Sequence, residues 1–379
     1  MTTKVAVIGA GIVGGVASYY LSKDPNIELT VFDEGIGQGT KASAGIISPW
    51  LSRRRNKKWY RMVRDAAAFY PDFLNEVMEG DQVPSTVYNK VGTLLFKTKP
   101  EYLDEMLEIG LKRREEAPEI GELAILTPEE IKTKIPIYDK EQSAVWASGG
   151  AKVDGGRLVD LLLKKVKDNQ ATLIEERAEL TVLDNGKYQV SSSSYTDTFD
   201  KVVLANAAWL GQTLEPLGYD VDVRPQKGQL AELEYNFNHD IDSKNWPVVM
   251  PEGESDIIPF DDGNIVVGAT HEDEMEFDLK VTPELVHSMI ESASETFSSE
   301  LSVDAVTKYR TGTRAYTSDY APFFGYVPEL EGVIVASGLG STGLTAGPLV
   351  GKILYELITN QEPSLPLEDY PASNYIQIK

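Results

Sequence analysis

The first part of the chain alternates between short apolar runs and glycine-rich turns. Residues 4–8, KVAVI, form a β-branched run that is typical of a buried parallel strand. A glycine turn and a helix of small residues to about residue 21 follow, and a second apolar run covers residues 27–32. Asp33 comes directly after this run. The pattern predicts strand, glycine turn, helix, strand and acid in one β-α-β unit.

This unit carries the spacing of a dinucleotide-binding fingerprint, with glycines at positions 9, 11 and 14. Gly9 permits a tight turn, Gly11 lets the backbone approach a pyrophosphate, and Gly14 lets the helix pack closely on the strand. The helix N-terminus offers free N–H groups to the phosphates, and Asp33 would accept hydrogen bonds from a ribose diol. We therefore expect an adenine dinucleotide here, with a glycine-rich turn of another α/β protein as the alternative. The fingerprint does not distinguish NAD from FAD.

Several later segments predict structure from local signals. Residues 35–45 are rich in Gly, Ala, Ser and Thr, so they can lie against a large planar cofactor or form a surface loop. Residues 101–119 predict a charged amphipathic helix. Thr127 begins a capping box before a short helix that Pro136 stops. Asp154 is expected to cap a helix that runs to about residue 167.

Two segments of the second half resemble parts of a binding site. Residues 256–270 predict a β-hairpin around an Asp-Asp-Gly turn, which places Asp256 close to the end of the second strand. Residues 333–336 predict a strand, followed by a second glycine turn at 338–343 and a helix to about residue 358. This turn is not expected to bind another nucleotide, because the short remaining chain contains no strand closed by an acid.

Composition restricts the possible chemistry. The 379 residues carry a formal charge of −23, which argues against nucleic acid and anionic membrane surfaces as partners. The basic run at residues 53–58 is therefore expected to be a solvated helix start or a positive rim. With no cysteine, the chain has no disulfide and no thiolate for catalysis or metal binding. His239, His271 and His287 lack the spacing of a metal site, so no metal is expected.

Neither a membrane span nor a signal peptide is expected. No apolar run approaches the ~20 residues of a spanning helix. The N-terminal residues also lack a long apolar region with a cleavage site. The expected location is the cytoplasm.

Motifs along the chain resemble the D-amino-acid oxidase (DAO) family of FAD-dependent oxidoreductases, which includes glycine oxidase, sarcosine oxidase and D-amino-acid dehydrogenases. They follow the family's order from residue 4 to about residue 358. One departure is Ala207, where the family usually has glycine. After the first unit, the matching segments are Thr40 with Ala44-Gly45-Ile46, VDGGRLV at 153–159, VVLANAAW at 202–209, VRPQKGQ at 223–229 and GTRAYTSDYAPFFG at 312–325.

The resemblance implies an α/β fold, with a Rossmann-like FAD-binding domain and an inserted α+β substrate domain built on an antiparallel sheet. FAD is expected to be non-covalent, because no cysteine can form a thioether link, although a histidyl link stays open. The expected FAD-binding domain comprises residues 1–86, 145–222 and 310–379, and the expected substrate domain comprises residues 87–144 and 223–309.

The resemblance also assigns site residues. Arg314 is expected to hold the substrate carboxylate, since a guanidinium fork matches it in bidentate fashion; an internal salt bridge to Asp319 is the alternative. Asp256 and His271 are expected on the substrate wall, facing the substrate amine, unless they form a rim pair in water. Some glycine-oxidase-like members have a second arginine near Ser341, which this chain lacks.

The residues expected to bind FAD come from both glycine turns and the segments beside them. The helix after the second turn would face the flavin pyrimidine and stabilise negative charge on the reduced ring. The expected FAD-binding residues are Gly9, Gly11, Ile12, Val13, Gly14, Asp33, Glu34, Thr40, Ala44, Gly45, Ile46, Ala205, Gly338, Gly340, Ser341, Thr342, Gly343, Leu344 and Thr345.

The implied activity is oxidation of a small amino acid (a D-amino acid, glycine, or an N-methyl or other secondary amino acid) to the imino acid. Hydride would pass from the α-carbon to flavin N5, with no obligatory protein base at that carbon. Oxygen, a quinone or another carrier would take the electrons. Two alternatives stay open: an NAD(P)-only dehydrogenase, and a flavoprotein that binds or senses an amino-acid-like metabolite without turnover. The substrate, its handedness and a homo-oligomeric state are also open.

Overall fold

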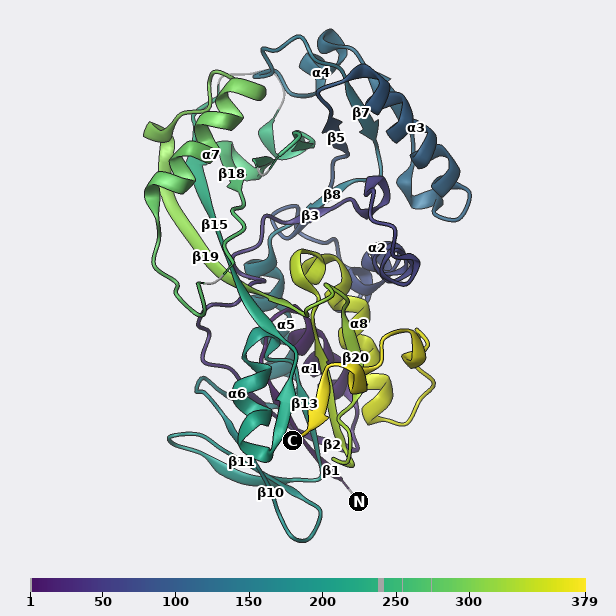
Figure 1. Ribbon diagram of the computed structural model, residues 1–379, viewed down its shortest axis with the longest axis vertical. Coiled ribbons are helices and arrows are strands. Elements are labelled where there is room, and N and C mark those ends of the chain that lie inside the picture. The colour runs from purple at the N-terminus through teal and green to yellow at the C-terminus, as the bar shows by residue number, and fades with distance from the viewer. Residues whose placement is uncertain (1, 238–241, 254, 274) are drawn as a thin grey trace.

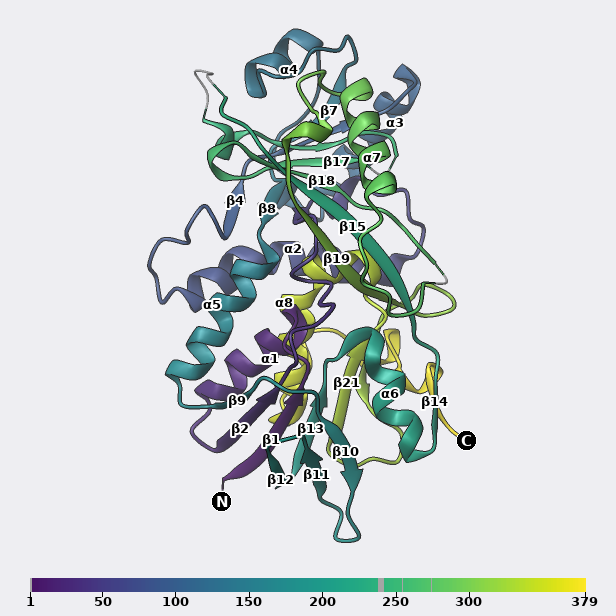
Figure 2. The same ribbon diagram turned by 90° about the vertical axis from the view of Figure 1, so that its left-hand side faces the viewer.

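The computed structural model describes residues 2–237, 242–253, 255–273 and 275–379, which form two lobes on two large sheets (Figure 1, Figure 2). His239, one of the three histidines of the sequence, lies outside the described residues. Within those ranges no helix is both long enough and apolar enough to cross a membrane.

The lobe that carries both chain ends is built on a six-stranded sheet in the order β20-β21-β13-β1-β2-β9 (Figure 1). Five of these strands run parallel, and β20 is antiparallel to β21. The two strands predicted at residues 4–8 and 27–32 are confirmed. The strands are β1 (Thr3–Ile8), β2 (Ile27–Phe32), β9 (Thr172–Ile174), β13 (Lys201–Leu204), β20 (Phe323–Tyr326) and β21 (Val333–Ser337).

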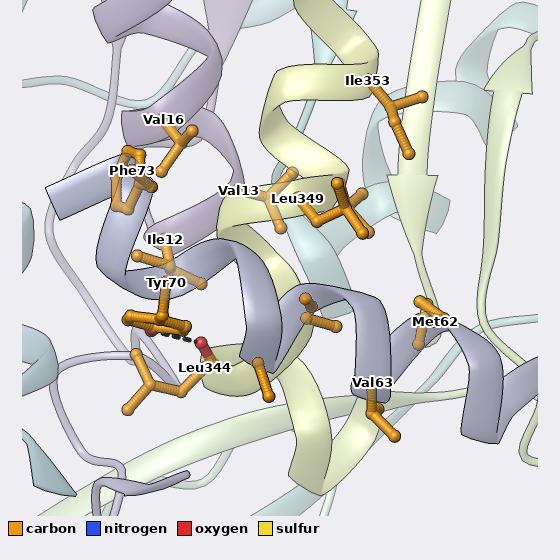
Figure 3. Packing of buried hydrophobic residues seen from close by; sticks show 14 of the residues in the cluster. Ile12, Val13, Val16, Met62, Val63, Tyr70, Phe73, Leu344, Leu349 and Ile353 are labelled. Carbon is orange, nitrogen blue, oxygen red and sulfur yellow. Dashed lines mark hydrogen bonds between the residues drawn. The ribbon is translucent and has the colours of Figure 1, made fainter. Parts of the chain in front are cut away.

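Helices of this lobe pack on one another beside the sheet. They are α1 (Ile12–Lys23), α2 (Lys57–Val77), α5 (Gly155–Asp168) and α8 (Gly343–Ile358). Figure 3 shows apolar side chains of α1, α2 and α8 meeting in one cluster. Inside this cluster the Tyr70 hydroxyl donates a hydrogen bond of 2.7 Å to the carbonyl oxygen of Leu344, which fixes the first turn of α8.

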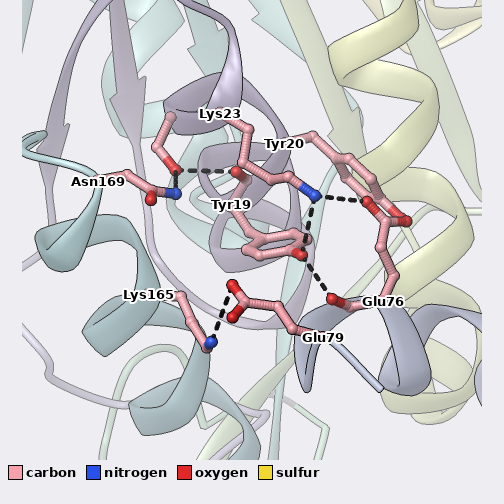
Figure 4. A network of polar contacts seen from close by, with 8 residues as sticks. Tyr19, Tyr20, Lys23, Glu76, Glu79, Lys165 and Asn169 are labelled. Carbon is pink, nitrogen blue, oxygen red and sulfur yellow. Dashed lines mark hydrogen bonds and ion pairs between the residues drawn. The ribbon is translucent and has the colours of Figure 1, made fainter. Parts of the chain in front are cut away.

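Polar contacts tie the C-terminal ends of three of these helices together (Figure 4). Lys23 of α1 donates to a carboxylate oxygen of Glu76 in α2 at 2.8 Å, and the Tyr19 hydroxyl donates to the Glu76 carbonyl oxygen at 3.1 Å. Lys165 of α5 lies 3.2 Å from Glu79, just beyond α2. The charged side chains of these two ion pairs are 25–75% exposed, so each pair is worth at most about 1 kcal/mol.

The second lobe is an eight-stranded sheet in the order β19-β15-β18-β17-β16-β5-β7-β6, antiparallel except for the β16–β5 pair. Helices α3 (Pro100–Arg114), α4 (Pro128–Lys134) and α7 (Pro283–Thr296) lie in this lobe (Figure 1). The strands are β5 (Thr93–Phe96), β6 (Leu123–Leu126), β7 (Ala144–Ala147), β15 (Arg224–Glu234), β16 (Val248–Met250), β17 (Asp256–Pro259), β18 (Asn264–Gly268) and β19 (Val306–Tyr316).

Smaller sheets and one short helix complete the fold. The elements are β3 (Ile46–Ile47), β4 (Tyr88–Lys90) and β8 (Ala151–Val153) in one sheet, β10 (Glu179–Val182), β11 (Tyr188–Ser191) and β12 (Thr196–Phe199) in a second, β14 (Tyr219–Val221) and β22 (Ile376–Ile378) in a third, and α6 (Leu210–Leu214).

Local signals placed several elements, with some corrections at their ends. The capping box at Thr127 is confirmed, and so is the cap at Asp154, which accepts a hydrogen bond from the Arg157 N–H. The helix predicted over 101–119 ends at Arg114, ahead of the helix-incompatible Pro118. The expected domain boundaries at 145 and 310 fall inside β7 and β19, which both belong to the eight-stranded sheet because they pair with β5 and β15.

Candidate active site

A cavity of about 490 Å³ lies between the two lobes and is lined by residues of both. It brings together residues predicted from six separate stretches of sequence. All of the predicted site residues line it except Gly14, which lies behind the first glycine turn. The structure therefore gathers the predicted cofactor residues and the predicted substrate residues around one space.

The first glycine turn brings three backbones into contact. Gly9 follows β1 with a φ of +97°, and a Cβ there would lie 2.6 Å from the carbonyl carbon of Ala205, after β13. A Cβ on Gly14 would lie 1.8 Å from the carbonyl oxygen of Gly9. Only glycine fits at either position. The N-terminus of α1 is thereby held against the cavity, where its partial positive charge suits a phosphate.

Asp33 closes this turn from the end of β2. Its carboxylate accepts hydrogen bonds from the backbone N–H of Ala10, from the N–H of Gly35 at 2.5 Å and from the Gln38 side-chain amide at 2.6 Å. A carboxylate has about four acceptor positions, so these three bonds leave one for a ribose hydroxyl. Glu34, beside it, is exposed at the cavity wall.

The segment after β2 follows the cavity as predicted for a segment that lies against a cofactor. The Thr40 hydroxyl accepts a hydrogen bond of 3.0 Å from the Ile12 N–H, so it caps the start of α1 from another part of the chain. Ala44, Gly45 and Ile46 continue along the wall. Ile46 then pairs with β8 in the small three-stranded sheet, which fixes the path of this segment.

The second glycine turn presents another helix N-terminus to the same cavity. Gly343, Leu344 and Thr345 form the first turn of α8 and line the wall. The Ser341 N–H, just before the helix, donates to the Tyr316 hydroxyl at 3.0 Å. The Thr345 hydroxyl donates to the Ile46 carbonyl oxygen at 3.3 Å. The helix thus places partial positive charge beside the segment that follows β2.

Buried polar atoms on the cavity wall support a bound polar molecule. Gln38 Oε1, Ser48 Oγ, Trp59 Nε1 and Asn206 Oδ1 have no hydrogen-bond partner within the described part of the chain. Buried polar atoms of native proteins are normally paired. Two helix N-termini, an acid at a strand end and these polar atoms fit the diphosphate, ribose and ring edges of FAD.

Arg314 lies on the wall of the second lobe. Its Nη1 donates to the Thr270 carbonyl oxygen at 2.8 Å and to Gln226 Oε1 at 3.2 Å. Its guanidinium lies flat over Gly228, where a Cβ would be 2.8 Å from Cζ and from both terminal nitrogens. The alternative partner, Asp319, instead accepts hydrogen bonds from Thr317, Ala321 and Tyr375. Arg314 is therefore held in one orientation at the cavity.

Asp256 and His271 line the same cavity as Arg314. The predicted hairpin is confirmed, since β17 pairs with β18 and Asp256 stands opposite Gly268. Burial raises the pKa of Asp256 from 3.8 to about 7. His271 is exposed at the cavity, while His287 is remote from it and shares a 2.7 Å hydrogen bond with Tyr309. The described residues contain no group of three or more possible metal ligands.

Gln226, Gly228 and Thr270 are not among the predicted site residues, although they set the position of Arg314. The first two belong to the motif at 223–229, on the strand paired with Arg314, so that motif carried a signal. Nothing local marks Thr270, which approaches from beyond β18. Ala207 also lines the cavity, and its φ of +49° explains why glycine is usual at this position in the family.

The basic run at 53–58 is engaged in contacts of the protein itself. Asn56 caps α2 by accepting a hydrogen bond of 3.0 Å from the Trp59 N–H. Arg53 pairs with Glu105 at 2.8 Å, and Lys58 pairs with Asp369 at 3.0 Å. This agrees with the interpretation of the run as a solvated helix start.

The chain is similar to known oxidoreductases over nearly its whole length. The DAO family, described as "FAD dependent oxidoreductase", matches residues 4–357. The uncharacterized oxidoreductase YurR of Bacillus subtilis is 37% identical over 96% of this chain and 97% of that protein. The glycine oxidase of Pseudomonas aeruginosa is 27% identical over 98% of each chain. The crystal structure of iminodiacetate oxidase from Chelativorans sp. BNC1 matches with a TM-score of 0.89 and 31% identity, covering 97% of this chain and 98% of that one.

These matches extend over both lobes, so they include the second glycine turn and the eight-stranded sheet. An NAD(P)-only dehydrogenase, one of the two alternatives, is thereby contradicted. The glycine turns, the cavity and the matches agree in one conclusion: the chain belongs to the DAO family of FAD-dependent oxidoreductases.

Proposed function

We propose that this enzyme oxidises a small amino acid to the imino acid. The donor is a D-amino acid, glycine, or an N-methyl or other secondary amino acid. The observation that carries the proposal is the position of Arg314, a fixed cation on the wall of the cavity that fits FAD. The names of two relatives support it, because glycine and iminodiacetate are both small amino carboxylates.

The roles of the cavity residues follow from their chemistry. Arg314 binds the substrate carboxylate, and its contacts with Gln226 and Thr270 keep the guanidinium in place while it does so. This grip positions the α-carbon, which is the main contribution a protein makes to such a reaction. The N-terminus of α8, which lies beside Ile46, would stabilise negative charge on the reduced flavin ring. When bound, FAD supplies the hydride acceptor.

The proposal assigns one lobe to each partner. The six-stranded sheet and its helices hold FAD, and the eight-stranded sheet supplies Arg314, Asp256 and His271 to the substrate. The imino acid then hydrolyses with water to the 2-oxo acid and ammonia, or to the 2-oxo acid and an amine when the donor is a secondary amino acid. Oxygen, a quinone or another carrier takes the electrons.

An artificial electron-acceptor dye tests this function whatever the natural acceptor is. The purified holoenzyme is incubated with the dye and with D-amino acids, L-amino acids, glycine, sarcosine, proline or iminodiacetate. We expect dye reduction with at least one of them, together with its 2-oxo acid in the mass spectrum. The carboxamide of the same compound should be inactive, because Arg314 then has no carboxylate to bind.

A holoenzyme that carries FAD but reduces no dye with any of these compounds would contradict the proposal. Such a result would favour the remaining alternative, a flavoprotein that binds an amino-acid-like metabolite without turnover. Equal activity with the carboxamide would contradict the assignment of Arg314.

A further inference from the structure

Asp256 faces the cavity without a partner from the protein. No hydrogen bond reaches its carboxyl from any residue that the structure describes, and burial is the one cause of its raised pKa. Side chains alternate along β17, and the neighbouring Ser255 donates to the Met289 carbonyl oxygen of α7. Asp256 therefore points to the opposite side, into the cavity.

Few charged groups surround this carboxyl. The adjacent strands β16 and β18 have the sequences VVM and NIVVG, so they carry no titratable side chain. On α7 the three glutamates at 284, 291 and 295 are exposed, and His287 is bonded to Tyr309. Among the described residues, the other charged or titratable side chains that the second lobe contributes to the cavity wall are Arg314 and His271. A ligand is thus the natural partner for Asp256.

Strand register puts Asp256 within reach of an amino acid held by Arg314. The guanidinium donates to the Thr270 carbonyl oxygen, two residues beyond Gly268, and Gly268 stands opposite Asp256. Thr270 is two residues along the chain from Gly268, at about 3.3 Å per residue, and neighbouring strands are about 4.8 Å apart. The Cα atoms of Thr270 and Asp256 are therefore roughly 8 Å apart. The carboxylate and amine of an α-amino acid, joined through one carbon, fit between these two anchors.

The proposed reaction needs an uncharged amine. In neutral water the nitrogen of an amino acid is an ammonium, which has no lone pair to form the C=N bond as hydride leaves the α-carbon. A base must therefore remove one proton from nitrogen first. Arg314 cannot do so, because a guanidinium does not lose its proton in proteins.

We propose that Asp256 is the base that removes this proton from the substrate ammonium, which makes it a catalytic residue of the amine and not of the α-carbon. The N–H bond of the ammonium breaks, its electron pair stays on nitrogen, and an O–H bond forms on the Asp256 carboxylate. No electron is transferred in this step. The proton later returns to water at the exposed side of the cavity, where His271 lies. This inference rests on the proposed function.

The basicity of Asp256 suits this task. A carboxyl with its ordinary pKa of 3.8 is a poor base toward an ammonium, and burial raises this pKa to about 7. Asp256 acts as a base only when ionised, so it loses this capacity as the pH falls below about 7. Above that pH it stays competent, and the rate no longer depends on its protonation.

The test compares the holoenzyme with its Asp256→Asn variant, using any amino acid that reduces the wild type. The rate of anaerobic flavin reduction is measured from pH 6 to pH 10. We expect the variant to be about 100-fold slower at pH 7. Its rate should rise about tenfold per pH unit, since a tenfold larger fraction of the substrate is then already neutral, and approach the wild-type rate near pH 9.

Controls separate this role from a loss of structure. Asp256→Glu keeps a carboxyl and should keep the wild-type shape of the pH profile at a lower rate. Asp220 is an exposed acid on β14 that pairs with Lys379, and Asp220→Asn should match the wild type. Acetate, which has a carboxylate but no amine, should perturb the flavin spectrum of Asp256→Asn at no higher concentration than in the wild type.

Three results would overturn the inference. These are a pH profile of Asp256→Asn that coincides with that of the wild type, an equal loss at every pH, or an Asp256→Glu variant that behaves like Asp256→Asn. If no amino acid reduces the wild type, the proposed function fails and this inference fails with it. The wild-type measurement therefore distinguishes the two.

Discussion

Arg314 shows how a single side chain is prepared for a ligand. Its guanidinium lies against the backbone of Gly228, and its hydrogen bonds to Gln226 and to Thr270 use only Nη1. The charged fork is therefore positioned before a carboxylate arrives, so less conformational entropy is lost on binding.

Removing this charge should weaken substrate binding and leave FAD in place. A charge-assisted hydrogen bond is worth about 1.5–3 kcal/mol, so Arg314→Leu should raise KM by roughly 10- to 150-fold. Arg314→Lys keeps the charge but loses the planar guanidinium fork, so its KM should lie between those of the wild type and Arg314→Leu. Steady-state kinetics and flavin content of all three proteins check this, and wild-type kinetics in Arg314→Leu would rule the assignment out.

Lys152 provides a prediction about stability. Its side chain is 1% exposed, burial lowers its pKa from 10.5 to about 7, and it donates to the Pro259 carbonyl oxygen. Between these two values the unfolded chain binds more protons than the folded chain. This group therefore adds stability as the pH rises, by up to about 1.4 kcal/mol per pH unit.

Lys152→Met removes this dependence. The wild type gains stability from this group between pH 7 and pH 9, and the variant does not. The free energy of unfolding of Lys152→Met minus that of the wild type should therefore fall with each pH unit. Urea unfolding of both proteins at pH 7, 8 and 9 measures the difference, and a difference that stays constant with pH would show that Lys152 is not a strongly perturbed group.

At the scale of elements, the paired strands β15 and β19 connect the two lobes and carry the substrate clamp. They run side by side along most of their length (Figure 2). In their register Gly228 stands opposite Gly312, and Gln226 stands opposite Arg314. Arg314 can lie across β15 because Gly228 has no side chain.

Gly228→Ala should therefore displace the guanidinium, since its Cβ would lie 2.8 Å from Arg314 Cζ. We expect a rise in KM of at least tenfold, with FAD content unchanged. Gly15→Ala in α1 serves as the matched control, because its Cβ would make only an ordinary contact, 3.6 Å from Leu162 Cδ1. Structural damage from Gly228→Ala would instead appear as lost flavin, and unchanged kinetics would mean that Arg314 does not need this position.

Elements with strong local signals could be predicted from sequence, and long-range pairings could not. The strand at 27–32, the cap at Asp154 and the hairpin at Asp256 each depend on neighbouring residues, and all are confirmed. The parallel pairing of β5 with β16 joins residues about 150 positions apart, so no local pattern marks it.

The same distinction holds for the site. The spacing of the first glycine turn placed Gly9 at a cofactor in advance, and the resemblance to the DAO family did the same for Gly343. The contact between Thr270 and Arg314 depends on how a hairpin end meets a neighbouring strand, which sequence spacing does not reveal. The left-handed backbone of Ala207, with a φ of +49°, could likewise not be predicted from its residue type, because alanine rarely adopts this conformation.

At the scale of the whole molecule, the cavity joins parts of the chain that are far apart in sequence. The N-terminal turn, the end of β13 and the start of α8 form one side, and the eight-stranded sheet forms the other (Figure 1). A ligand that binds all of them binds only the folded chain, so FAD should contribute to stability as well as to chemistry.

The size of that contribution depends on the FAD concentration. At a free FAD concentration 100 times Kd, the folded state should be stabilised by about 2.7 kcal/mol relative to the apoprotein. Thermal unfolding of the apoprotein over a series of FAD concentrations measures this, and NAD serves as a control that should not shift the midpoint. A midpoint that does not respond to FAD would mean that the folded chain does not bind FAD in preference to the unfolded chain, which contradicts the assignment of the cofactor.

The most direct test of the central claim is the visible spectrum of the purified protein, reconstituted with FAD and followed under argon as amino acids are added. The account predicts a flavin absorption band that at least one small amino acid bleaches. In the Arg314→Leu variant the same amino acid should bleach the band only at much higher concentrations. A protein that takes up no flavin after FAD is added would contradict the account at its foundation. A flavin band that none of the amino acids bleaches would contradict the proposed oxidation and leave the fold and the cofactor standing.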